Sequence, residues 1–181
     1  VNMPKDKVEA AINRASSKDT SGYVEIIYEG YGPHGIAVVV ECATDNPTRT
    51  VANVRHSFRK YGGSLGTTGS IAFIFERKGL FKAPKSAVAD LENLELELID
   101  AGLDDFSYDD DSIYIFAPFQ EYGSMQKALE ERNIEITATE IQYLPVNYKE
   151  LSDEQKKEVS ELIEVLEEDD DVQSVYHNMQ Q

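Results

Sequence analysis

The chain has 181 residues, and its 17 Lys and Arg side chains against 34 Asp and Glu give a formal net charge of −17. A hydrophobic content of 41% is typical of a folded protein and excludes a wholly disordered one. The one cysteine, Cys42, excludes an internal disulfide framework and metal sites built on several thiolates. No run of about 18 apolar residues is present, so the sequence predicts no membrane-spanning helix. Because the first residue is Val1 and not Met, we expect the chain to be part of a longer protein.

The acidic charge is concentrated in the second half of the chain. Residues 1–83 carry 11 basic and 8 acidic side chains, residues 84–144 carry 3 and 15, and residues 145–181 carry 3 and 11. An acidic surface repels phosphate backbones, so only the first part of the chain is suited to approach nucleic acid. The alternative interpretation is that the acidic side chains keep the protein in solution.

A helix is predicted first, because Asn2-Met3-Pro4 is a typical helix start and apolar positions at helical spacing follow it to Ala15. A polar linker separates this helix from the next elements. Apolar, β-branched runs then predict strands, and Asn46-Pro47 predicts the start of a helix that Gly62-Gly63 ends. The later elements of this part are strands at 23–29 and 36–43, a helix at 47–61, and strands at 70–76 and 79–82.

Residues 79–144 are predicted to follow the order strand, helix, strand, strand, helix, strand. This order is the ferredoxin-like split βαβ arrangement, which belongs to the α+β class. The predicted elements lie at 79–82, 86–101, 104–109, 112–117, 121–132 and 134–143.

The C-terminal segment is predicted to form one helix and one strand. Ser152 and Gln155 make a capping-box pattern, which predicts a helix from there to about Glu168. The strand at 172–176 has no partner in its own segment, and a single strand is not stable alone. We therefore expect it to pair within the sheet that contains residues 36–43. The predicted organisation is a discontinuous α+β domain of residues 22–78 and 145–181, into which a ferredoxin-like domain of residues 79–144 is inserted.

Two glycine-rich stretches resemble nucleotide-binding loops only in part. Residues 30–35 match G-x-G-x-x-G, but a dinucleotide site needs this loop to lead into a helix, and here a strand follows. We interpret these residues as a hairpin turn. Residues 62–69 run from a helix into a strand, the reverse of a P-loop, and no Gly-Lys-Ser/Thr closes them. They are interpreted as a connecting loop, with a backbone nest for phosphate as the alternative.

The helix predicted at 47–61 has an apolar face and a basic face. At about 100° per residue, the apolar side is formed by Val51, Val54, Phe58 and Tyr61. The side opposite carries polar and basic residues, two arginines lie on one flank, and a nearby strand adds two more cations. This face is either a solvated surface or a surface that contacts phosphates. The candidate nucleic-acid-binding residues are Arg49, Arg55, His56, Arg59, Lys60, Arg77 and Lys78.

The sequence carries no recognisable catalytic or metal-binding signature. Its three histidines are scattered and lack a neighbouring His or Cys at ligand spacing. The run Asp109-Asp110-Asp111 lacks the glycine and the distal glutamate of a calcium loop. Nucleophile-elbow and zinc-protease motifs are also missing. The sequence therefore predicts a protein that is not an enzyme, with no catalytic residue, no cofactor and no metal.

Short motifs that form a family pattern are spread over nearly the whole chain. They are Asn2-Met3-Pro4-Lys5-Asp6, Glu29-Gly30-Tyr31-Gly32-Pro33, Thr44-Asp45-Asn46, Arg49-Thr50-Val51, Arg55, Phe58, Lys60, Gly62-Gly63, Leu65-Gly66, Gly69-Ser70, Phe75, Lys78-Gly79, Asp171-Val172-Gln173 and Val175-Tyr176-His177-Asn178. Together these motifs resemble those of the YebC/PmpR family.

The resemblance implies three domains: an N-terminal helical domain and two α+β domains, the third inserted in the second. Residues 1–21 would then be the last helix and the linker of the N-terminal domain, whose basic remainder lies outside this chain. Members of the family are known as DNA-binding transcriptional regulators of the bacterial cytoplasm. We therefore expect a non-enzymatic regulator whose partner is nucleic acid, bound mainly through the missing domain, and no membrane partner.

Other members of the family imply an alternative function. Mitochondrial relatives activate translation, and a ribosome-linked role is attributed to the bacterial proteins. The alternative is therefore a ribosome-associated translation factor that contacts ribosomal RNA.

Overall fold

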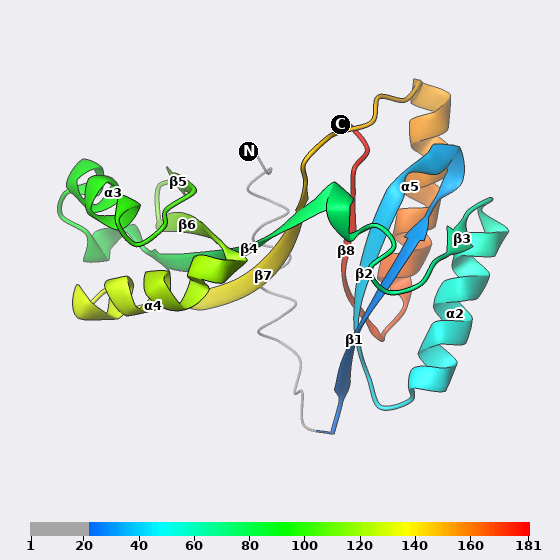
Figure 1. Ribbon diagram of the computed structural model, residues 1–181, viewed down its shortest axis with the longest axis horizontal. Coiled ribbons are helices and arrows are strands. Elements are labelled where there is room, and N and C mark those ends of the chain that lie inside the picture. The colour runs from blue at the N-terminus through cyan, green and yellow to red at the C-terminus, as the bar shows by residue number, and fades with distance from the viewer. Residues whose placement is uncertain (1–21) are drawn as a thin grey trace. The chain divides into compact units, whose positions relative to one another are not determined.

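The computed structural model describes residues 22–181, which divide into two compact units. The α2–α5 unit comprises residues 22–76 and 143–181, and the β4–β7 unit comprises residues 77–142. Each unit contains a four-stranded sheet, and two helices pack on one face of each sheet (Figure 1). The predicted α+β class is confirmed. The helix expected at about residues 4–15 lies outside the described residues.

The sheet of the α2–α5 unit has the strand order β3–β1–β2–β8. Its strands are β1 (Val24–Tyr31), β2 (Ala37–Thr44), β3 (Ser64–Leu65) and β8 (Val172–His177). β1 and β8 both pair with β2 in the antiparallel sense, so that Val40 lies between Tyr28 and Val175. The predicted pairing of the last strand beside residues 36–43 is confirmed.

Two helices, α2 (Pro47–Lys60) and α5 (Asp153–Glu168), cover one face of this sheet (Figure 1). Val54 and Phe58 of α2 and Leu162 of α5 are buried against the β2 residues on that face. The predicted capping box is present at the start of α5, where the side chains of Ser152 and Gln155 bond to each other's backbone N–H groups.

The opposite face of β2 is also buried. There Ala37 and Val39 pack against Ile71, Phe75 and Tyr176. A strand buried on both faces needs an unbroken apolar sequence, which is what the run of residues 36–40 supplies. β2 is therefore the central strand around which both layers of the unit are packed.

The sheet of the β4–β7 unit has the order β5–β6–β4–β7, which is the ferredoxin-like order. Its core lies between the sheet and the two helices, where Phe81, Ile113, Leu98 and Leu129 are fully buried. The elements are β4 (Phe75–Pro84), α3 (Leu91–Ile99), β5 (Asp105–Tyr108), β6 (Ser112–Pro118), α4 (Tyr122–Glu131) and β7 (Ala138–Pro145).

One strand replaces the two that were predicted at 70–76 and 79–82. Residues 72–74 form a short 3-10 turn, and β4 then runs unbroken through Gly79. Gly79 lies within the strand, and its lack of a side chain leaves room for the ring of Tyr122. A Cβ atom at Gly79 would lie 2.5 Å from Cδ2 of that ring.

Two further element boundaries differ from the prediction. α3 begins at Leu91 and not at residue 86, because the Asp90 side chain accepts a hydrogen bond from the Asn93 N–H and caps the helix there. β7 begins at Ala138 and not at residue 134. The N–H of Ile134 instead closes the end of α4 by donating to the carbonyl of Leu129, after Asn133 adopts φ of +53°.

Candidate nucleic-acid interface

Helix α2 is held firmly at its start and along its inner face. The side chain of Asn46 accepts a hydrogen bond from the Arg49 N–H at 3.1 Å, and Pro47 occupies the first turn, where its missing N–H costs nothing. Val54 and Phe58 are buried in the core below the helix. The cap and the buried side chains therefore fix the backbone of α2, from which the outer side chains extend.

Besides Arg49, four basic side chains of α2 are exposed: Arg55, His56, Arg59 and Lys60. No acidic residue occurs between Asn46 and Phe75, so α2 and the loop after it carry positive charge only. Within the described part of the chain, neither Arg55 nor Arg59 forms an ion pair, so both guanidinium groups are available to a partner. The ammonium of Lys60 lies 5.3 Å from the centre of the Tyr61 ring.

Arg49 has a different role from the other cations of α2. Its Nη2 lies 2.9 Å from Oδ2 of Asp171 and 3.1 Å from Oδ1 of Asp45, and its Nε also donates to Asp171. Asp171 is only 6% exposed, and the hydroxyl of Thr50 donates to it at 2.8 Å. Burial raises the pKa of Asp171, but hydrogen bonds from Arg49 and Thr50 outweigh burial and hold that pKa below its usual value. Arg49 therefore joins the start of α2 to the segment before β8.

The two flanks of α2 face different surroundings. Arg49 and Asn53 point to the turn between α5 and β8, where the Asn53 amide donates to Asp169 at 3.2 Å. Arg55 lies on the other flank, toward β1. Burial raises the pKa of Tyr28 on β1, and the positive charge of Arg55 partly opposes that rise. Arg59, one helical turn further along, shares the β1 flank with Arg55.

The two candidates from β4 lie in the β4–β7 unit. Lys78 is 5% exposed, and its ammonium is paired with the carboxylate of Asp104. Arg77 is exposed, and its guanidinium lies 3.9 Å above the ring of Phe119. Adjacent strand residues point to opposite faces, so these two neighbours serve different surroundings.

The glycine-rich loop after α2 is organised around an acid of the chain itself. The carboxylate of Glu29 accepts hydrogen bonds from the N–H groups of Gly69 at 3.0 Å and Ile71 at 3.1 Å, and its backbone carbonyl accepts from Gly66 at 2.8 Å. Glu29 is 9% exposed. A phosphate nest would need these same donors, so the connecting-loop interpretation is the one that the hydrogen bonds support.

The G-x-G-x-x-G stretch is the turn of the β1–β2 hairpin. Tyr31 pairs with Ala37, and the residues between them form a 3-10 turn in which His34 has φ of +60°. The imidazole of His34 is paired with the carboxylate of Glu158, and the carbonyl of His34 accepts from the ammonium of Lys149 at 2.6 Å. The loop is thus fixed to α5 and leads into a strand, as the hairpin interpretation predicts.

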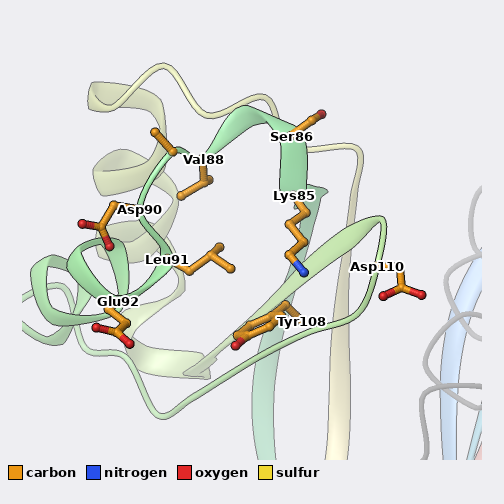
Figure 2. Close-up of a pocket in the computed structure, with 9 residues that line it drawn as sticks. Lys85, Ser86, Val88, Asp90, Leu91, Glu92, Tyr108 and Asp110 are labelled. Atoms are coloured by element: carbon orange, nitrogen blue, oxygen red, sulfur yellow. The ribbon is translucent and has the colours of Figure 1, made fainter.

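A hollow of about 670 Å³ lies at the start of α3 in the β4–β7 unit (Figure 2). The ammonium of Lys85 is held there by the carbonyl of Asp109 at 2.9 Å and by the ring of Tyr108, whose centre is 4.6 Å away. Asp90 is engaged as the helix cap. Lys85 and Asp90, two of the polar residues that line this hollow, thus serve the local fold.

Two other kinds of site are not found within residues 22–181. No group of three or more His, Cys, Asp or Glu side chains is placed to hold a metal ion. No helix in this range is long and apolar enough to cross a membrane.

Comparisons with known proteins identify the family. The family described as "TACO1/YebC second and third domain" matches residues 23–179. A protein of Porphyromonas gingivalis, named "Probable transcriptional regulatory protein", is 52% identical over 180 residues, which is 99% of this chain and 74% of that protein. A protein of the same name from Parabacteroides distasonis gives the same values. The crystal structure of a conserved hypothetical protein, Aq1575 from Aquifex aeolicus, has a TM-score of 0.69 and 35% identity, over 99% of this chain and 74% of that one. The chain therefore belongs to the TACO1/YebC family.

Proposed function

We propose that this chain is part of a non-enzymatic, cytoplasmic regulator that binds nucleic acid, with DNA as its target. The name of the relatives, which calls them transcriptional regulatory proteins, supports a regulatory role. The chain's own contacts to phosphate would come from the exposed cations of α2, with Arg77 as a separate contributor. Arg49 and Lys78 are left out of the proposed contact surface, because their side chains are committed to Asp171 and Asp104.

The observation that carries this proposal is the acid-free stretch around α2 in a chain of net charge −17. Acidic side chains elsewhere repel a phosphate backbone, whereas the exposed cations of α2 attract one. Because Val54 and Phe58 anchor the helix, the backbone positions from which its cations extend are fixed. Contacts of this kind orient a protein on nucleic acid without reading its sequence.

The overall charge predicts that this chain binds DNA weakly by itself. The affinity for DNA rises with the number of phosphates that the protein neutralises, and this chain has few cations available for such contacts. We expect a dissociation constant of about 10⁻⁴ M or weaker at physiological salt. The whole Porphyromonas gingivalis relative, of which this chain matches 74%, should bind more tightly and with a steeper salt dependence than its matched region. Equal affinities at equal salt would contradict this expectation.

A matched pair of double variants tests the role of α2. The Arg55→Ala/Arg59→Ala chain should bind a labelled DNA duplex several-fold more weakly at low salt, with a salt slope reduced by about 2. The control is Lys127→Ala/Lys157→Ala, which removes two exposed lysines elsewhere. Fluorescence anisotropy over a range of salt concentrations gives both affinity and slope. Equal losses in the two double variants would reject α2 as the contact surface.

The target is tested separately from the contact surface. Crosslinking the intact protein in cells, followed by sequencing of the bound nucleic acid, should recover genomic DNA. Recovery of mostly ribosomal RNA would replace the DNA proposal by the ribosome-associated alternative.

A further inference from the structure

The outer edge of β1 is open over most of its length. β3 has only two residues, and they pair with Gly30 and Tyr31 at the end of β1. Within residues 22–181, no strand pairs with the outer side of β1 from Val24 to Tyr28. Val24 is 53% exposed at the start of this segment. An apolar edge strand with unpaired main-chain groups is a template on which another extended chain can pair.

The hydrogen bonds of β1 show which of its groups face outward. Gly66 donates its N–H to the carbonyl of Glu29, so the main-chain groups of Glu29 point away from β2. Alternate residues of an antiparallel strand point to the same side. The N–H and C=O groups of Glu25 and Ile27 therefore point outward as well, and they are separated by the spacing that an added strand requires.

Positive charge borders this edge on the α2 side. Tyr28 packs against the core under α2, so by alternation Ile26 is on the same face of the sheet. Arg55 lies on the flank of α2 that faces β1, Arg59 follows it one helical turn later, and the sequence from Asn46 to Phe75 contains no acidic residue. Alternate side chains of a strand added beside β1 would lie next to Ile26 and Tyr28, below these two arginines.

The positive charge of Arg55 and Arg59 favours an acidic strand over a second copy of this chain as the occupant of the β1 edge. A second copy of the chain, paired through its own β1 around a two-fold axis, would place Arg55 and Arg59 opposite their symmetry mates. Like charges in such positions oppose association. A strand with carboxylates on its α2-facing side would instead pair its charges with these arginines while its main chain bonds to Glu25 and Ile27.

We propose that β1 is a docking site for an extended, acidic peptide segment of a partner protein, which adds to the sheet as a fifth strand beside Val24–Tyr28. The main-chain hydrogen bonds supply affinity, and Arg55 and Arg59 supply the preference for acidic sequences. This proposal does not rest on the proposed binding to nucleic acid, and the two partners would compete for the same two arginines.

Synthetic peptides test the proposal on the 181-residue chain. The probe is a labelled, capped octapeptide that alternates Val and Glu, and the comparison peptide alternates Val and Lys. The Val–Glu peptide should bind about ten-fold or more tightly than the Val–Lys peptide, and Arg55→Glu/Arg59→Glu should abolish this preference. Binding of the Val–Glu peptide should slow hydrogen exchange at the amides of Glu25 and Ile27, as measured in two-dimensional NMR spectra of the chain.

A pair of substitutions at one position separates main-chain pairing from charge. Glu25→Pro removes one outward N–H and should weaken binding of the Val–Glu peptide about ten-fold, whereas Glu25→Thr keeps the N–H and should bind at least as well as the unmodified chain. Thermal melts establish that both variants fold. Equal binding by the two variants, or unchanged exchange at Glu25 and Ile27 in the unmodified chain, would overturn the proposal.

A competition experiment with single-stranded oligothymidylate tests nucleic acid as the occupant of the edge. If the oligonucleotide binds more strongly than the Val–Glu peptide, displaces it, and binds the Glu25→Pro variant equally well, the edge is assigned to nucleic acid and the proposal is overturned.

Discussion

Arg49 and Asp171 are 122 positions apart in the sequence, and Nη2 of the arginine lies 2.9 Å from Oδ2 of the aspartate. The contact joins the first turn of α2 to the residue just before β8. It is reinforced by Thr50, which donates to the same carboxylate at 2.8 Å. The first and last parts of the α2–α5 unit are therefore connected by a charged, partly buried network as well as by the pairing of β2 with β8.

Replacing Asp171 by Asn should destabilise the chain in a pH-dependent way. The folded-state pKa of Asp171 lies below its ordinary value of 3.8, so its ionised form stabilises the fold. This contribution is fully present above that ordinary value and is lost as the pH falls through the folded-state pKa. At neutral pH we expect Asp171→Asn to lower the free energy of unfolding by about 1–3 kcal/mol. Urea unfolding at neutral and acidic pH measures the difference, which should shrink at acidic pH. A difference that stays constant with pH would show that the carboxylate charge is not involved.

The exposed arginines of α2 should matter little for stability, in contrast to the phenylalanine between them. Arg55→Ala and Arg59→Ala should each change the free energy of unfolding by no more than about 0.5 kcal/mol. Phe58→Ala should cost roughly 3–5 kcal/mol, because the ring is fully buried in the core. Thermal melts of the variants provide the comparison. A large loss in the arginine double variant would mean that these side chains are structural.

Glu29 should control the order of the glycine-rich loop. Glu29→Ala leaves the N–H groups of Gly69 and Ile71 without their acceptor, which should cost about 1–3 kcal/mol and speed hydrogen exchange at both amides. Glu29→Gln keeps one carbonyl oxygen and should protect the loop better than Ala does. Exchange at Phe58 serves as a control, because this residue is in the core of the same unit. Unchanged exchange at Gly69 and Ile71 in Glu29→Ala would show that the loop is held by other contacts.

We propose that residues 77–142 fold as an independent domain. This segment holds its own buried core, and the strands of its sheet pair with one another. Expressed alone, it should give a cooperative thermal transition and a dispersed NMR spectrum. Residues 84–144 lack all of β4 except Pro84, including the buried Phe81, and serve as the control, which should remain unfolded. A random-coil spectrum for residues 77–142 would reject the domain.

Local patterns predicted the elements better than they predicted the contacts. Ser152 and Gln155 specify the start of α5 through neighbours three residues apart, and the partnerless last strand points to β2. The ion pairs of Arg49 with Asp171 and of Lys78 with Asp104 leave no local pattern, because each depends on segments that only the fold brings together. The helical-wheel angles placed Arg49 on the outer side of α2 and could not show which flank faces an acid. The space that Gly79 leaves is filled by the ring of Tyr122, 43 positions away, a contact that no local pattern indicates.

The placement of β8 beside β2 has a consequence for synthesis on the ribosome. β2 is the most deeply buried strand of its unit, yet one of its two edges stays unpaired until residues 172–177 have left the exit tunnel. During that interval its apolar residues are exposed on a nascent chain, a condition that favours wrong pairing and aggregation. Residues 77–142 emerge complete before that point. Under the proposed independent folding of residues 77–142, the order of folding therefore differs from the order of synthesis: the middle of the chain can reach its native structure while the segment made before it still waits for the last strand.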